Sequence, residues 1–153
     1  MAQVLIAAVK DLKEWVGKEV GVSAWHEVTQ AEVNMFAQAT GDHQWIHLDP
    51  ERAARESPYG RTIAHGFFTL SLIPRLRAEI VDVDKKRMTI NYGLNKVRFP
   101  APTPVGEKVR MRAQLAAVED VKGGVQATWL FTLEVSGQDK PACVAESLTR
   151  YLE

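Results

Sequence analysis

Cysteine is nearly absent from this sequence, because Cys143 is the single cysteine among 153 residues. One cysteine excludes an internal disulfide and any metal site built from several thiolates. No histidine stands near it along the chain, so nothing points to an activated thiolate. We therefore expect Cys143 to be a small buried hydrophobic residue.

A charge imbalance and a long apolar run are also missing. The 19 basic and 19 acidic side chains give a formal net charge of +0, so no overall field favours nucleic acid or an anionic membrane. The apolar run over residues 4–9 is too short for a secretory signal or a membrane span. These absences predict a cytoplasmic protein with no nucleic-acid partner and no membrane partner.

What the sequence does contain is typical of one globular domain. Hydrophobic residues make up 46% and charged residues 25% of the chain, which is too apolar for a disordered protein. The length is close to the preferred size of one domain, and neither a repeat nor a linker interrupts it. Residues 1–153 are therefore predicted to form a single domain.

Helical patterns occupy the first half of the chain. Apolar residues recur at helical spacing over residues 3–16, which predicts an amphipathic helix stopped by Gly17. Thr29 and Glu32 have the spacing of a capping box, so a second helix is expected to begin there after a short strand.

A loop is predicted over residues 41–50. Gly41 directly follows the second helix and is a natural left-handed helix terminator. Asp49 and Pro50 then have the residue types of an N-cap and a first helical position, so a third helix begins at the end of this loop.

Residues 66–80 are apolar almost all round, which is typical of a buried central helix. Pro74 removes one backbone amide inside it, so a kink or a tightened turn is expected near residues 70–74. Over residues 88–151 the apolar period changes to two, with turn signals between the segments, and this predicts antiparallel strands. The expected fold class is α+β, with an antiparallel sheet wrapped around the central helix.

The densest polar cluster lies in the 41–50 loop and contains Asp42 and His47. On a continuous helix these two side chains would point about 140° apart, so only a loop can aim both at one water molecule. A carboxylate that accepts a proton from water and an imidazole that holds or transfers it would form a catalytic pair. The alternative is that Asp42 merely turns the chain and His47 is a buried core histidine.

A metal site is a further interpretation of this loop, because His43, His47 and Asp49 are close in sequence. However, Gln44 stands where the helical zinc motif has glutamate, and Gly41 argues against a continuous helix. No metal is therefore expected.

The segment Ala64-His65-Gly66 opens the predicted central helix. Free amides at a helix start, beside a glycine that permits close approach, suit a thioester oxygen that gains negative charge. Gly66 is the leading candidate for that role, and His65 is a second one. Alternatively, Gly66 only permits tight packing and His65 only caps the turn.

Together these residues resemble a known family. Two segments resemble the hydratase motif of MaoC-like and (R)-specific enoyl-CoA hydratases, namely Gly41-Asp42-His43-Gln44-Trp45-Ile46-His47-Leu48-Asp49-Pro50 and Ala64-His65-Gly66-Phe67. A third segment looks most like the NodN-type branch of that family, namely Asn91-Tyr92-Gly93-Leu94-Asn95-Lys96-Val97-Arg98-Phe99-Pro100. The resemblance runs from about residue 12 to about residue 150.

The resemblance implies a hot-dog fold and the reversible syn hydration of a trans-2-enoyl thioester to its (3R)-hydroxy product, without metal or redox cofactor. It implies that Asp42 and His47 flank the catalytic water and that the Gly66 amide binds the thioester oxygen. Where related hydratases often have a functional serine, eight residues beyond this glycine, the sequence has Pro74. Residues expected to support the pocket instead are Trp45, Phe67 and Ser71, although a serine in a helix often bonds only to its own backbone.

The resemblance also implies partners. The substrate would be an acyl-CoA or an acyl carrier protein thioester, with Lys96, Arg98 and Lys86 as candidates for binding coenzyme A phosphates. The family forms dimers through joined sheets, and exposed edge strands favour a homodimer here. A hot-dog thioesterase and a non-catalytic acyl-thioester binding module are the competing interpretations of the function.

Overall fold

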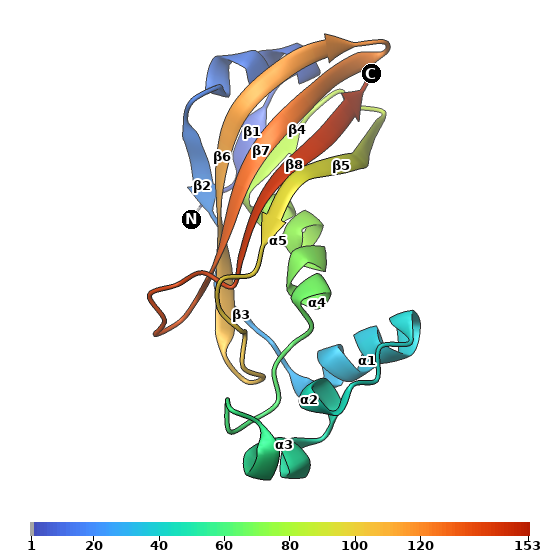
Figure 1. The fold of residues 1–153 in the computed structure, drawn as a ribbon. Coiled ribbons are helices and arrows are strands. Elements are labelled where there is room, and N and C mark those ends of the chain that lie inside the picture. Colours follow the sequence, from blue (N-terminus) through green and yellow to red (C-terminus); the bar gives the residue numbers. More distant parts are fainter. Residues whose placement is uncertain (1) are drawn as a thin grey trace.

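The computed structural model describes residues 2–153, and their main element is a strongly curved six-stranded antiparallel sheet with the central helix on its concave side (Figure 1). The sheet order is β2 (Glu19–Val22), β6 (Lys108–Val121), β7 (Gly124–Val135), β8 (Cys143–Leu152) and β5 (Met88–Arg98), and the short β3 (His26–Glu27) also pairs with β6. The α+β architecture expected from the sequence, with a sheet around a central helix, is confirmed.

Strict alternation along the long strands gives the sheet one buried face. In β7 every second residue is buried, its neighbours in β8 follow the same alternation, and those in β6 follow it as far as Leu115, where the register shifts. The predicted hairpin is present, because Lys122 and Gly123 connect Val121 to its partner Gly124. Gly123 has φ of 86°, a left-handed conformation that glycine adopts without strain.

The central helix is divided into α4 (Gly66–Ser71) and α5 (Ile73–Ile80). At the break, the Leu72 amide donates to the Thr69 carbonyl at 3.2 Å, three residues back rather than four. Pro74 has no amide hydrogen with which to continue the regular ladder. The predicted tightening near residues 70–74 is therefore confirmed.

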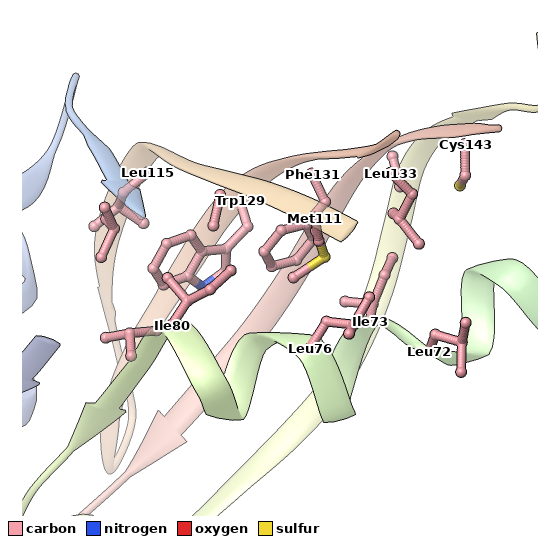
Figure 2. Packing of buried hydrophobic residues seen from close by; sticks show 14 of the residues in the cluster. Leu72, Ile73, Leu76, Ile80, Met111, Leu115, Trp129, Phe131, Leu133 and Cys143 are labelled. Carbon is pink, nitrogen blue, oxygen red and sulfur yellow. The ribbon is translucent and has the colours of Figure 1, made fainter. Parts of the chain in front are cut away.

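Helix α5 packs its apolar side against the concave face of the sheet (Figure 2). Leu76 is fully buried there, facing a layer of strand residues that includes Trp129 and Phe131, whose stacked rings lie 5.6 Å apart. The Trp129 indole nitrogen donates to the Tyr151 hydroxyl at 3.2 Å, so the one polar atom of this ring is paired. This core fixes the axis of the central helix.

The predicted amphipathic helix over residues 3–16 is wrong in its first half. Residues Val4–Ile6 form strand β1, which pairs in parallel with β4 (Val81–Val83), and a 3₁₀ helix follows at Val9–Trp15. Part of the apolar spacing that suggested an α-helix comes from this 3₁₀ helix, in which Val9 and Leu12 are buried one turn apart. Pairing with β4 outweighs the weak helix preference of the first residues.

Three short helices form a group beyond the amino-terminal end of α4 (Figure 1). They are α1 (Gln30–Thr40), α2 (Trp45–Leu48) and α3 (Pro50–Glu56). The Thr29 half of the predicted capping box and the Asp49 cap are confirmed, because the Thr29 hydroxyl accepts from the Glu32 amide and the Asp49 carboxylate accepts from the Arg52 amide. The Glu32 carboxylate lies 3.1 Å from Nε2 of His26 instead. The loop predicted over 41–50 is irregular only at its start, since α2 adds one helical turn inside it.

Cys143 lies fully buried in the core, as the sequence predicts. Burial raises the pKa of its thiol to about 11, so the reactive thiolate is disfavoured. Within residues 2–153, none of the helices has both the length and the apolar composition that a membrane crossing requires.

The packing in Figure 2 predicts that Leu76→Ala destabilises the protein by about 2–5 kcal/mol, because the truncation leaves a cavity under the sheet. The exposed Leu5, with 74% of its surface accessible, provides the matched control, and Leu5→Ala is expected to change stability by about 0.5 kcal/mol or less. Urea unfolding of both variants measures the difference. Equal midpoints for the two variants would contradict this view of the core.

Candidate active site

The segment of residues 62–65, which leads into α4, holds α2 by two hydrogen bonds of Ile63, one to the backbone of α2 and one to the His47 side chain. The Ile63 amide donates to the Ile46 carbonyl at 3.0 Å, and the Ile63 carbonyl accepts from Nδ1 of His47 at 2.7 Å. The same segment is tied to the sheet side of the molecule, because the Ala64 amide donates to the Thr103 carbonyl at 2.8 Å. The helix that carries His47 is thereby fixed to the start of the central helix.

His47 is buried, with 7% of its surface accessible. Because a carbonyl oxygen can only accept, Nδ1 carries the hydrogen in its bond to Ile63. In the neutral ring, Nε2 therefore holds the lone pair and is available to take a proton. This arrangement gives one ring nitrogen a structural role and leaves the other for chemistry.

Gln30 and Thr62 support His47 and were not identified from the sequence. The Gln30 side-chain amide donates to the His47 carbonyl at 2.7 Å, and the Thr62 hydroxyl donates to the Gln30 side-chain oxygen at 2.7 Å. Gln30 belongs to α1, so this chain of bonds joins three segments at one point. The only sequence signal was the position of Gln30 inside the capping box, which suggested a helix start and nothing more.

Asp42 follows the end of α1, where Gly41 has φ of 81° and its amide donates to the Ala37 carbonyl. The Asp42 side chain is exposed, and its carboxylate accepts from the Gln44 amide at 3.4 Å. A carboxylate oxygen of Asp42 and one ring nitrogen from each of His47 and His65 all lie within 4.8 Å of one another. The two residues that the sequence paired are thus brought together.

His65 contacts both Asp42 and His47. Its ring stacks on the His47 ring at 3.9 Å with 26° between the planes, and its Nε2 lies 3.0 Å from the Asp42 carbonyl oxygen. Nε2 is therefore occupied by a backbone contact, and the prediction that His65 binds the thioester oxygen has no support from this geometry. Its contacts with Asp42 and His47 indicate a supporting position.

Gly66 and His47 line two neighbouring cavities, with volumes of about 490 Å³ and about 340 Å³. The larger cavity also contains Asp42. As the first residue of α4, Gly66 has no carbonyl one turn earlier in the helix to accept from its amide. The larger cavity is lined by Phe36, Thr40, Asp42, His47, His65, Gly66, Phe67 and Phe99.

Phe99, just after β5, covers Gly66 and was missed by the sequence analysis. A Cβ atom placed on Gly66 would lie only 3.2 Å from the Phe99 ring, so a side chain at this position would press on the ring. Phe99 lines both cavities and forms an aromatic pair with Phe67, their centroids 6.1 Å apart. A glycine here therefore serves close approach, as its place at the helix start suggested.

The three residues expected to support the pocket lie in different places. Phe67 lines the larger cavity with 71% of its surface exposed. Trp45 instead packs against the Arg52 guanidinium at 4.3 Å, on the side of α2 that faces α3. The Ser71 hydroxyl donates to the Phe68 carbonyl of its own helix at 2.6 Å, and Ser71 lines a separate cavity of about 360 Å³ with Asn91, Leu94 and Ser147.

The three candidate phosphate-binding cations do not form one group. Lys96 and Arg98 lie at the end of β5 that leads to Phe99, whereas Lys86 precedes the start of this strand of 11 residues. Such a strand is roughly 30 Å long, so one phosphate cannot contact both groups. Lys86 instead pairs with the Asp82 carboxylate at 2.6 Å.

Burial lowers the pKa of His47, and the neighbouring His65 ring acts in the same direction. The hydrogen bond to Ile63 and the Asp42 carboxylate oppose this shift but do not overcome it. The neutral imidazole, which can accept a proton, is therefore the favoured form of His47 near neutral pH.

Asp42, His47 and His65 offer the donor types of a metal site, and this set differs from the His43, His47 and Asp49 set considered from the sequence. Their geometry suits a metal poorly, because a nitrogen lone pair lies in the ring plane and the two stacked planes are only 26° apart. Two rings arranged face to face direct their lone pairs almost in parallel. Nε2 of His65 and Nδ1 of His47 are also engaged with carbonyl oxygens.

The curved sheet around a central helix is the hot-dog architecture, and solved structures confirm this class of fold. The structure of an (R)-hydratase from A. caviae superimposes with a TM-score of 0.71 at 24% identity, covering 88% of this chain and 96% of that one. The family described as MaoC like domain matches residues 11–134. The chain therefore belongs to the MaoC-like family.

Two relatives cover almost the whole chain. The 3-hydroxyacyl-thioester dehydratase Z of Mycobacterium tuberculosis (strain ATCC 25618 / H37Rv) is 59% identical over 146 residues, which is 95% of this chain and 96% of the relative. Nodulation protein N of Rhizobium leguminosarum bv. viciae is 40% identical over 145 residues, or 93% and 89% of the two chains. The resemblance to the family and to its NodN-type branch is confirmed.

The buried position of His47 predicts that its ring titrates below the usual histidine value of about 6.5. The unfolded chain binds that proton more readily, so acidification below about pH 6.5 is also expected to cost stability. The ring Cε1–H signal, assigned with a His47→Gln variant and followed by NMR against pH, gives the midpoint. A midpoint at or above 6.5 would refute the neutral, proton-accepting form.

Proposed function

We propose that this chain hydrates trans-2-enoyl thioesters and dehydrates (3R)-hydroxyacyl thioesters, with Asp42 and His47 as the reacting groups. The chain is a hydro-lyase of the 3-hydroxyacyl-thioester dehydratase type, as its similarity to the mycobacterial relative of that name indicates. The roles proposed for these residues rest on one observation. Asp42, His47 and Gly66, whose amide is the first of α4, all line the same cavity.

Asp42 and His47 carry out the proton transfers of the hydration. The Asp42 carboxylate accepts a proton from a water molecule whose oxygen forms a bond to C3 of the enoyl group. His47 orients this water through Nε2 and exchanges the proton with Asp42, and the pair returns one proton to C2 on the same face. One water is thereby added across C2=C3, and dehydration follows the same steps in reverse. Each proton-transfer role is expected to contribute roughly 10²- to 10⁴-fold in rate.

The Gly66 amide stabilises the negative charge that forms on the thioester oxygen during this reaction. As water adds to C3, the electron pair of the C2=C3 bond moves toward the thioester oxygen and forms an enolate. The free amide at the start of α4 donates to that oxygen, and the apolar lining of the cavity strengthens the interaction. Loss of such a donor typically costs about 2.7–4 kcal/mol in the transition state.

The proposed mechanism needs neither metal nor redox cofactor. Addition of water to an enoyl thioester changes no oxidation state overall, and the enolate charge is met by a backbone amide. The stacked orientation of His47 and His65 supports this proposal, because it disfavours a shared ion. A cytoplasmic location is also part of the proposal and rests on the sequence alone.

A coenzyme A thioester is the proposed substrate form, with an acyl carrier protein thioester as the alternative. Arg98 and Lys96 support this proposal, because they lie at the end of β5 that continues into Phe99 beside the cavities. Lys86 is not included among the proposed phosphate-binding residues, because it lies at the other end of β5.

We also propose that two copies of the chain form a homodimer through β5. This strand is at the edge of the sheet, so half of its backbone hydrogen-bonding groups face outward. It also carries four large apolar side chains that are 39–54% exposed, namely Met88, Ile90, Tyr92 and Leu94. A second β5 in antiparallel pairing would cover both features.

The proposed chemistry predicts that Asp42→Asn and His47→Gln each reduce hydration of crotonyl-CoA and of a medium-chain enoyl-CoA by roughly 10²- to 10⁴-fold. The loss of enoyl-thioester absorbance measures the rate. His43→Gln is the matched control, because His43 is an exposed neighbour in the same loop, and it should hydrate like the parent.

Hydration at the parent rate by either variant would overturn the assignment of the pair. A thiol reagent added to the same reactions detects free coenzyme A, and its release without hydration would identify a thioesterase. Binding of the thioester with neither reaction would identify a non-catalytic binding module.

The proposed dimer predicts that light scattering at micromolar concentration gives twice the chain mass of 17.1 kDa. Leu94→Asp should reduce this value toward one chain, because a carboxylate would be buried without a partner at the β5 interface. Met35→Asp, at an apolar position on α1 that is 62% exposed, should leave the mass unchanged. A monomeric parent protein would refute the proposed interface.

A further inference from the structure

His65 is almost completely buried, with 3% of its surface accessible, and it contacts the proposed catalytic residues from the start of the central helix. Its ring lies against His47 on one side, and the Phe36 ring lies 4.9 Å away. Its Nε2 contacts the Asp42 carbonyl rather than the Asp42 carboxylate. One side chain therefore contacts both members of the pair without occupying the atoms that react.

The hydrogen positions on this ring follow from its partners. A carbonyl oxygen only accepts, so Nε2 of His65 carries the hydrogen that it donates to Asp42. Nδ1 is buried and has no hydrogen-bond partner among the described residues. The tautomer with its hydrogen on Nε2 thus leaves no buried donor unpaired, and the ring is suited to donate in one direction only.

We propose that His65 is a positioning residue, which holds the Asp42 backbone and the His47 ring in register for proton transfer. The proposal rests on the proposed roles of Asp42 and His47. Asp42 lies on an exposed stretch between α1 and α2, and within residues 2–153 its carboxylate has a single hydrogen bond, a long one of 3.4 Å from the Gln44 amide. The bond from His65 ties this stretch to α4, whereas the Ile63 carbonyl ties His47 to the same segment.

Two separate effects follow from this position. Without the donor, the Asp42 backbone is free to move relative to His47, and a displacement of about 1 Å in a reacting group typically costs on the order of 10²-fold in rate. Without the imidazole, His47 loses the stacking contact that helps to fix the plane of its ring, while its hydrogen bond to Ile63 remains.

Two variants separate the effects. His65→Phe keeps a ring of similar shape against His47 and Phe36 but removes the donor. His65→Gln places an amide donor near the position of Nε2 but removes the ring. We expect His65→Phe to reduce kcat for crotonyl-CoA hydration roughly 10- to 100-fold with a smaller change in KM. His65→Gln should recover roughly tenfold of that loss, because its amide can donate to the Asp42 carbonyl in place of Nε2.

Recovery by His65→Gln is the readout that a merely structural role would not give, because this variant restores a donor without restoring the ring. Circular dichroism and thermal unfolding establish that each variant is folded before it is compared. Parent-like kcat in His65→Phe, or equal losses in the two variants, would each overturn the positioning role. If the parent does not hydrate enoyl thioesters, or Asp42→Asn retains full activity, the proposed function fails instead.

Discussion

The reciprocal hydrogen bonds between α2 and Ile63 are the constraint on which the proposed site depends. One of them orients His47 and leaves its Nε2 free, and the other fixes the helix that carries it. The segment around Ile63 leads directly into α4, which continues into α5, and the core in Figure 2 holds α5 against the sheet. The packing of α5 under the sheet therefore also fixes the position of the site, where Asp42 and His47 lie close to the first amide of α4.

Much of the fold could be predicted from the sequence because each element carried a local signal. Alternation in β7, the Lys122-Gly123 turn, the left-handed Gly41 and the break before Pro74 all depend on residues close together in the chain. The first residues could not be predicted in this way. Val4–Ile6 form a strand because they pair with β4, a partner far along the chain that apolar spacing does not reveal.

The same distinction separates the predicted part of the site from the rest. Asp42 and His47 were identified because Gly41 ends the helix just before them, so that a loop could bring them together, and Gly66 because it opens an apolar helix. Contacts across long sequence separations were invisible, including the Phe99 ring over Gly66 and the bonds from Thr62 through Gln30 to His47. Trp45 and Ser71 contact residues close to them in the chain, Arg52 and Phe68, and the sequence does not reveal on which side of the site these contacts lie.

The central claim is that a thioester binds with its oxygen at Gly66 and its reacting carbons between Asp42 and His47. The most direct test is a crystal structure of the protein with a slowly reacting enoyl-CoA analogue. We expect the thioester oxygen about 3 Å from the Gly66 nitrogen, with a water molecule in contact with both Asp42 and Nε2 of His47. An acyl group bound in the separate cavity beside Ser71, with the Gly66 amide unoccupied, would contradict it.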